Sequence, residues 1–376
     1  MSRTQPIRRV GGFSLLEILV SVAVVGGVLL VITSAMATMQ NTYVRTRARM
    51  DIYRSAHSAM ETISRRVTMA TLDARWQVPP QGAESTDPDY ERESDLHFYC
   101  GPVQGLPGIS GDESGHAVFF QAPLGIDDVM ADDNSQMRHE RLSQALNAWG
   151  YFVELHSDAS QRPDFMAEAG LARSPRLRFR LMEFRQPTDE LSVFRAQPAD
   201  PFGKPAISFG TSRQAVLSYT ENAFMTDNEQ RSRTSVVAEN IVAFLIRPVS
   251  GGTDPGNQNL QRYALAPDMT YDTRAFQYAS TPISRLTRHV LPPAVEITLV
   301  AVAEEAWDRL GPQQAPFMMQ QIKSMVDNSF ADFSSFDSNL QTLQRFLNQN
   351  KIEHRVLVQT VPLPEGRRPE TRTATP

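Results

Sequence analysis

The chain has 376 residues, a formal net charge of −5 and one cysteine, Cys100, so it is long enough for one large or two small domains and cannot form an intrachain disulfide. An exported domain of this chain must therefore be held together by its apolar core alone. The 37 basic residues form no cluster with interleaved aromatic side chains, which excludes a nucleic-acid footprint.

The first element along the chain is a short basic leader that ends at a glycine pair. Its arginines precede Gly12, which is followed by Phe13 and, four residues later, by Glu17. From Ile18 to Met39 no residue is charged, and this run is long enough to cross a bilayer, which takes about 20 residues. A carboxylate in such a segment costs roughly 2.5–3.5 kcal/mol on insertion scales, so Glu17 needs a compensating partner.

Cleavage between Gly12 and Phe13 would create that partner. The nitrogen of Phe13 would then be an amine with an ordinary pKa of about 8, mostly cationic at neutral pH. Residues i and i+4 share one face of a helix, so Glu17 can meet this ammonium in its own chain or in a neighbouring subunit. Pairing offsets the desolvation cost of the carboxylate. The alternative is that Glu17 lies at the membrane interface with no partner.

These residues resemble the class III signal of type IV prepilins and type II secretion pseudopilins. In that family a membrane-bound prepilin peptidase cuts after the last glycine and N-methylates the new first residue, usually phenylalanine. The resemblance implies a prepilin leader over residues 1–12, cleavage between Gly12 and Phe13, N-methylation of Phe13 and an assembly role for Glu17. It also implies a single-pass protein of the inner (cytoplasmic) membrane with its C-terminal domain in the periplasm. A secretory signal peptide cut after Ala35-Met36-Ala37 is the competing interpretation.

The apolar segment continues as an amphipathic helix. No proline lies between Pro6 and Pro79, which predicts one helix from Phe13 to Asp73 within a transmembrane and amphipathic segment at 13–75. Its second half needs a sheet to cover a narrow apolar stripe. The stripe consists of Val44, Ala48, Ile52, Ala56, Met60, Ile63, Val67 and Ala70. Gly26 and Gly27 interrupt the run of helix formers. Three interpretations remain open: a weak point in the helix, close packing against another helix through the small pair Ala23 and Gly27, or simple tolerance of glycine in lipid.

Residues 76–364 predict an exported α+β domain with a mainly antiparallel sheet, loop insertions and late helices, because the strands are not regularly interleaved with helices. The insertions are at 199–213, 248–258 and 265–282, and residues 365–376 are expected to form a disordered tail. The expected strands are Asp95–Cys100, His116–Gln121, Trp149–Leu155, Arg176–Phe184, Glu190–Phe194, Ser235–Ile246, Ala294–Ala303 and His354–Pro362. The expected helices are Pro316–Asn328 and Asp337–Asn350.

Two local patterns in this domain carry finer predictions. Arg176–Leu181 alternates strictly between charged and apolar residues, which predicts a strand with one wet face and one buried face. Glu304 and Glu305 beside Trp307 are interpreted as the exposed end of a strand.

Short blocks in the domain resemble the J-type minor pseudopilin of type II secretion and, more closely, the Verru_Chthon cassette protein C family, prepilin-like proteins encoded in a four-gene cassette. The resemblance implies a pilin-like fold and three partners: prepilin peptidase, other pseudopilins or cassette proteins, and an inner-membrane assembly platform. The J-like blocks are Val237–Val242, Tyr271-Asp272 and Leu291–Ile297, and the cassette-like blocks are His116–Leu124, Asn147–Phe152, Phe179–Pro187 and Arg355–Leu357.

The sequence contains no nucleophile, zinc, phosphate-binding or dinucleotide motif, so we expect no enzyme, no cofactor and no metal site. The seven histidines are scattered, and His57 is expected on the exterior of the long helix. Asp127-Asp128 and Asp132-Asp133 with Asn134 offer oxygen ligands that Ca²⁺ prefers, but their spacing fits no known loop.

Together these features predict a structural subunit. It would be a minor pseudopilin, processed by prepilin peptidase and assembled into a type II secretion or type IV pilus-like envelope complex. The alternative is a membrane-tethered binding module that uses the prepilin signal only for export.

Overall fold

The computed structural model describes residues 14–77, 91–94, 96–104, 112–125, 145–157, 176–186, 188, 234–249, 265–266, 268–273 and 289–366. By internal contacts the chain divides into two units, Met1–Asp51 and Ile52–Pro376. The long predicted helix is present as α1 (Leu15–Val67), which crosses this boundary. It ends earlier than Asp73, because a turn follows Val67 and Asp73 itself has a φ of 44°, which a right-handed helix does not allow.

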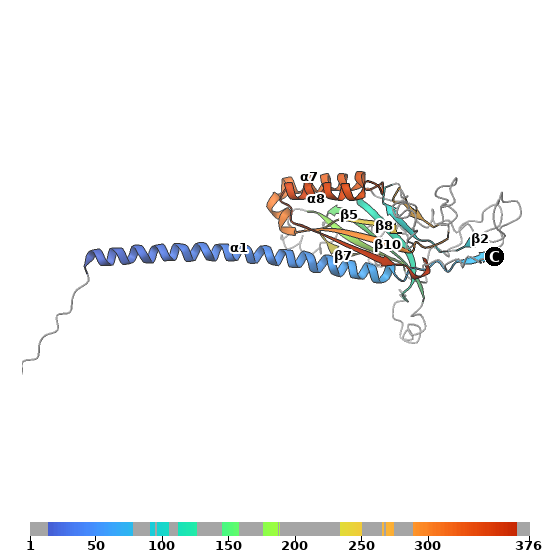
Figure 1. The fold of residues 1–376 in the computed structure, drawn as a ribbon, viewed down its shortest axis with the longest axis horizontal. Coiled ribbons are helices and arrows are strands. Elements are labelled where there is room, and N and C mark those ends of the chain that lie inside the picture. The colour runs from blue at the N-terminus through green and yellow to red at the C-terminus, as the bar shows by residue number, and fades with distance from the viewer. Residues whose placement is uncertain are drawn as a thin grey trace, which may run out of the picture. The chain divides into compact units, whose positions relative to one another are not determined.

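The second unit contains two main antiparallel sheets (Figure 1). The larger has the strand order β7-β6-β5-β4-β3-β9 and the smaller has the order β11-β10-β8, and a pair β1–β2 stands apart. The large sheet consists of β7 (Thr234–Glu239), β6 (Leu177–Gln186), β5 (Leu146–Ser157), β4 (Glu113–Pro123), β3 (Tyr99–Pro102) and β9 (Tyr271–Asp272). The others are β11 (His354–Pro362), β10 (Ala294–Val302), β8 (Ile241–Val249), β1 (Arg75–Gln77) and β2 (Glu91–Glu93).

Two helices and a short turn complete the described fold. Figure 1 shows α7 (Glu304–Ser329) and α8 (Phe336–Gln349) side by side, and a 3-10 helix, η4, covers Pro364–Gly366. Both late helices are confirmed. The range of α7 begins at Glu304, before the expected Pro316, but the helix is interrupted by a kink at Gly311, whose φ of 76° and ψ of 172° are not helical. The mainly antiparallel α+β architecture predicted from the sequence is therefore confirmed.

Most expected strands are confirmed, with three differences. The run Ser235–Ile246 is two strands, because Asn240 adopts a φ of 60° and turns the chain from the large sheet into the small one. Strand β3 begins only at Tyr99. Glu304 and Glu305 are not the end of a strand, since they form the first turn of α7, where acidic side chains favour the helix dipole. The expected strand Glu190–Phe194 lies outside the described residues.

The large sheet carries buried residues on both faces, so the predicted wet face of β6 is correct only near the start of the strand, where Arg176 is exposed and Arg178 is partly exposed. Alternate residues of its strands enter two different core clusters: Phe120 and Leu181 belong to the main one, whereas Phe119 and Met182 belong to a smaller one. Arg180 lies among the residues of the expected wet face and is only 1 % exposed. Alternation shows which side chains share a face, but it does not show whether another part of the chain covers that face.

The C-terminal part of α1 belongs to the main core. Ile52, Ala56, Met60, Ile63 and Val67 are buried there, which confirms this part of the predicted stripe. The side chains of the two earlier stripe positions, 44 and 48, lie outside the described residues. His57 is exposed as expected, and its ring stacks on Tyr53 at 5.5 Å between centroids.

A cation fixes this helix to the large sheet. The guanidinium of Arg66 lies 4.2 Å from the centroid of the Trp149 ring and donates to the Tyr151 hydroxyl at 2.8 Å. It also forms an ion pair with Glu183, whose side chain is nearly buried. Arginine suits this position better than lysine, because its planar guanidinium can stack on the Trp149 ring and also donate to the nearly buried Glu183 carboxylate.

His116 connects three elements at a second point. Its Nδ1 lies 2.9 Å from the carbonyl oxygen and 3.1 Å from the backbone nitrogen of Ile246, and its Nε2 lies 2.7 Å from the carbonyl oxygen of Phe330. A ring protonated on Nε2 donates to Phe330 and accepts from the N–H of Ile246, whereas a ring protonated on Nδ1 donates to the Ile246 carbonyl. Burial lowers the pKa of His116, although the carbonyls of Phe330 and Ile246 oppose this effect.

The described chain extends beyond the expected end of the domain. The sequence prediction begins a disordered tail at residue 365, whereas the Glu365 carboxylate accepts hydrogen bonds from the Thr71 hydroxyl at 2.6 Å and from the backbone N–H of Leu72 at 3.0 Å. Residues 367–376 lie outside the described residues.

We expect Arg66→Met to lower the free energy of unfolding by about 2–3 kcal/mol. The change leaves Glu183 nearly buried without its cation, and the value lies below that for a fully buried pair because the Arg66 side chain is 28 % exposed. Arg65→Met is the matched control, because its pair with Glu61 is exposed, and it should cost less than about 0.5 kcal/mol. Urea unfolding of the full chain in detergent, followed by tryptophan fluorescence, measures both. Equal losses would contradict the anchoring role of Arg66.

We expect His116→Gln to weaken the pH dependence of stability. The unfolded chain binds a proton at His116 with a pKa of about 6.5, whereas the folded pKa is lower. The contribution of His116 is therefore complete above about pH 6.5 and declines as the pH falls below it. Between about pH 7.5 and pH 5.5 the unchanged chain should lose more unfolding free energy than the variant, because the other titrating groups are common to both. Identical pH profiles in urea unfolding would refute this assignment.

Candidate functional site: the N-terminal apolar helix

The first part of α1 is an apolar helical surface that nothing in the described chain covers. Within Leu15–Gln40 an 18-residue window has a mean hydropathy of 2.8, and no residue of the segment is buried. An apolar surface of this length is unfavourable in water, so it requires lipid or other apolar helices around it. Its length and composition fit a single membrane crossing, as an anchor or as a signal sequence.

Ser14 begins this helix as its N-cap. The Ser14 side-chain oxygen accepts a hydrogen bond from the backbone N–H of Glu17 at 3.2 Å, and the Ser14 carbonyl accepts one from Ile18 at 3.2 Å. The order Ser14-Leu15-Leu16-Glu17 is that of a capping box, in which the acid at the third helical position also supports the helix start. The sequence analysis did not predict this capping role of Glu17, although the S-x-x-E spacing indicates it.

Within the described residues, no hydrogen bond or ion pair reaches the Glu17 carboxylate, and its side chain is exposed. Gly12 and Phe13, the predicted cleavage site, lie outside these residues. The structure therefore places Glu17 at the start of the helix. Its pairing with the Phe13 amine remains a prediction.

The hydroxyl groups of the apolar segment are satisfied inside the helix. Ser21 donates to the carbonyl of Glu17 at 2.7 Å, and Thr33 donates to that of Leu29 at 2.7 Å. Ser34 and Thr38 make the same kind of bond, to Val31 and Ser34 respectively. Each hydroxyl thus presents little unsatisfied polarity to an apolar medium, which makes the segment compatible with lipid.

Gly26 and Gly27 lie in continuous helix, and the chain itself does not require them. A Cβ added at either position would meet no atom within 4 Å. Since alanine is the better helix former by about 1 kcal/mol, neither glycine is explained by packing inside this chain. Close packing against another molecule and tolerance in lipid both remain open.

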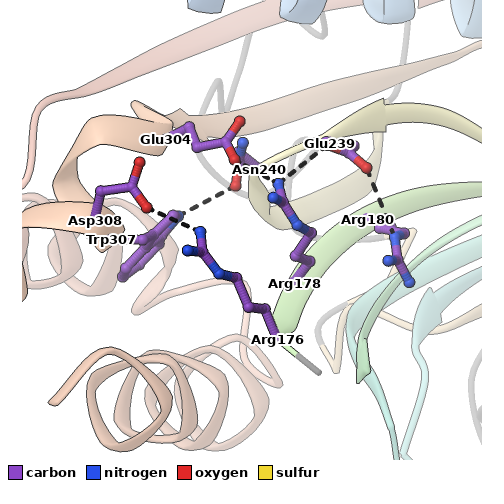
Figure 2. A network of polar contacts seen from close by, with 8 residues as sticks. All are labelled: Arg176, Arg178, Arg180, Glu239, Asn240, Glu304, Trp307 and Asp308. Atoms are coloured by element: carbon purple, nitrogen blue, oxygen red, sulfur yellow. Dashed lines mark hydrogen bonds and ion pairs between the residues drawn. The ribbon is translucent and has the colours of Figure 1, made fainter. Parts of the chain in front are cut away.

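A second polar constellation joins β6 to the start of α7 (Figure 2). Arg176 pairs with Asp308 at 3.0 Å, and Arg178 pairs with Glu304 at 2.7 Å. Both acids belong to the first turns of α7, whereas Arg178 lies in β6 and Arg176 immediately precedes that strand. These ion pairs hold the start of α7 against the sheet.

The same view shows how Asn240 and Arg180 continue this network (Figure 2). The indole N–H of Trp307 donates to the Asn240 side-chain oxygen at 3.2 Å, which supports the turn between β7 and β8. Arg180 lies beside Glu239 and Glu154 across neighbouring strands, with 3.9 Å to an oxygen of each. Burial raises the pKa of Glu154, an effect that His156 and Arg180 oppose.

These polar groups give no indication of catalysis. The carboxylates of the network are opposed by arginines, and no group of three or more metal-ligating side chains occurs among the residues that the structure describes. The acidic pairs between 127 and 134 lie outside them. Cys100 is fully buried, and burial raises its pKa, which disfavours a reactive thiolate.

Sequence reasoning located Glu17 but missed Arg66 and His116. Arg66 is one of several arginines in α1, and its special position follows only from contacts with β5 and β6, far along the chain. His116 begins a predicted strand, but no local pattern predicts that a turn beyond α7 meets its ring.

No protein-family model, no curated protein and no solved structure matches this chain.

Proposed function

We propose that the chain is a minor pseudopilin: a membrane-anchored structural subunit that prepilin peptidase cuts after Gly12 and methylates at Phe13. The mature subunit assembles with other pseudopilins or cassette proteins on an inner-membrane platform, with its C-terminal domain in the periplasm. The partners are inferred from the resemblance to the Verru_Chthon cassette protein C family. That resemblance rests on the short sequence blocks given in the sequence analysis.

The observation that carries the proposal is the position of Glu17. It lies in the first turn of an apolar helix whose exposed surface needs a hydrophobic environment. A carboxylate there is unfavourable in lipid unless it gains a partner, and cleavage at Gly12 would create a new ammonium four residues before it in the chain. The Ser14 cap starts the helix at Leu15, so Glu17 lies in the first turn, at the end of the helix where the new terminus would be.

The architecture of the second unit is consistent with a pilin-like domain. Its main core receives one side of α1 together with residues from both sheets, as a pilin's long helix requires. The family-like blocks lie on its central strands: His116–Leu124 covers much of β4, Asn147–Phe152 lies in β5, and Leu291–Ile297 leads into β10. Such blocks are core strands, so they support a shared fold and carry no information on partners.

We expect the mature chain to begin at N-methylated Phe13. Mass spectrometry of the N-terminus of the membrane-extracted protein measures this directly. Gly12→Ala should leave a longer, uncut chain, because the peptidase requires the glycine at the cut. A mature N-terminus at Thr38 would support the secretory signal peptide instead, and normal processing of Gly12→Ala would contradict the class III signal.

Glu17 can be required for its charge or for its place in the capping box, and two substitutions separate these roles. Glu17→Gln keeps a side chain that suits the third helical position but removes the negative charge. Ser14→Ala removes the cap, at a cost of about 1 kcal/mol, and keeps the charge. We expect Glu17→Gln to lower co-purification with partner subunits about tenfold, and Ser14→Ala to leave it within about twofold.

The readout is recovery of partner subunits on the tagged chain extracted from membranes, with processing checked by N-terminal mass. If Glu17→Gln assembles normally while Ser14→Ala does not, the acid acts in helix capping and the assembly role of its charge is wrong. If both assemble normally and processing is intact, the prepilin signal serves export alone, as in a tethered binding module.

A further inference from the structure

Helix α1 carries three arginines shortly after its apolar part. No charged residue occurs at 18–44, and Arg45, Arg47 and Arg49 then follow at alternate positions of the same helix. No acidic residue occurs at 18–50, so this part of the chain contains positive charge alone.

Nothing in the described part of the chain covers this stretch of the helix. Every residue of 42–51 whose side chain is described is exposed, among them Tyr43 and Arg47. The ion pair of Arg47 with Asp51 is loose, at 3.9 Å, and both side chains are more than half exposed. Such a pair contributes little, so the charge of Arg47 is available to a partner outside the chain.

The rise of the helix places these residues at the level of lipid headgroups if residues 18–39 span the hydrocarbon core. Tyr43 then lies about 6 Å beyond Met39 along the helix axis, Arg45 about 9 Å and Arg47 about 12 Å. The headgroup layer is about 5–8 Å thick on each side of the core. Helical side chains tilt toward the N-terminus, which here is the direction of the membrane, so arginines placed after the span reach back into that layer. Tyrosine is typical of this depth as well.

The arrangement of the arginines around the helix favours lipid over a protein partner. Successive residues turn by about 100°, so positions 45 and 49 share one side of the helix and position 47 lies nearly opposite. A protein that packs on one face of the helix would meet only one of these sides, whereas headgroups surround the helix. The planar guanidinium group also matches the geometry of phosphate oxygens.

We propose that Arg45, Arg47 and Arg49 bind the headgroups of anionic phospholipids at the C-terminal end of the membrane span. The lipid phosphates neutralise the three arginines and hold this end of the span at the bilayer surface. Each arginine close to an anionic surface strengthens such binding by about fivefold. The inference rests on the membrane-anchor part of the proposed function, but not on cleavage, methylation or assembly.

Energy transfer in vesicles tests this site. The full chain carries a donor dye at Thr42→Cys, an exposed position of α1, in phosphatidylcholine vesicles with a trace of acceptor-labelled lipid. The native Cys100 is buried, so the chain without Thr42→Cys is the labelling control. A phosphatidylglycerol acceptor should be enriched around the protein about threefold or more over a phosphatidylcholine acceptor at low salt. Salt at about 1 M should remove most of this excess, because it shortens the Debye length to about 3 Å.

Matched substitutions assign the enrichment to the three arginines. Joint replacement of Arg45, Arg47 and Arg49 by Gln should reduce the anionic acceptor to the level of the neutral one. Joint replacement by Lys should keep at least about half of the excess, because lysine also binds phosphate as a point charge. Arg54→Gln with Arg65→Gln removes two exposed arginines further along α1 and should leave the enrichment unchanged.

Each outcome decides the proposal. Resistance of the chain to alkaline extraction, measured on the same vesicles, shows whether α1 is inserted. An inserted chain with equal enrichment of both acceptors overturns the lipid site and leaves the membrane anchor intact, whereas an extracted chain overturns both. Enrichment that survives the glutamine replacements also overturns the site. If these replacements abolish co-purification of partner subunits but not lipid enrichment, an acidic protein surface is the occupant and the lipid site is wrong.

Discussion

A continuous apolar helical surface without cover is the constraint on which the rest of this protein depends. Leu15–Gln40 has no buried residue, so none of the described part of the chain covers this surface. The same helix becomes part of a well-packed core from Ile52 onward, where its apolar side meets both sheets. One helical element therefore has an uncovered apolar part, long enough to cross a membrane, and a part that is packed into a core.

Because of this constraint, Glu17 matters in two ways, as part of the helix cap and as a charge beside an apolar span. As the third residue of a capped helix, it belongs to a common start signal that any soluble helix could carry. As an acid at the edge of an apolar span, it is costly unless a cation reaches it. The two roles predict different behaviour of glutamine at this position, so the charge can be examined separately from the helix start.

Periodicity predicted the elements well because it reports on each segment's own chemistry. The stripe from Ile52 to Val67, the late helix around Leu343 and the strands with apolar runs all followed from spacing. The cover on the predicted wet face of β6 beyond the start of the strand did not, because burial of Arg180 depends on segments far away in the chain. The split at Asn240 was missed because a single residue in a left-handed conformation interrupts an otherwise unbroken strand pattern. For the candidate site, the sequence indicates the acid and the span, whereas contacts such as those of Arg66 appear only after folding.

The bonds from Thr71 and Leu72 to Glu365 have a mechanical consequence. They connect the point where the chain leaves α1 with the short helix that follows β11, across a separation of 294 and 293 residues. A pull transmitted along α1 would therefore reach the end of β11 directly, in addition to the strands that follow α1 in sequence. Strand β11 is paired with β10 over nine residues, so such a load would act on a long ladder and not on a single terminal strand. The fold is thus closed at the place where a force along α1 would enter the core.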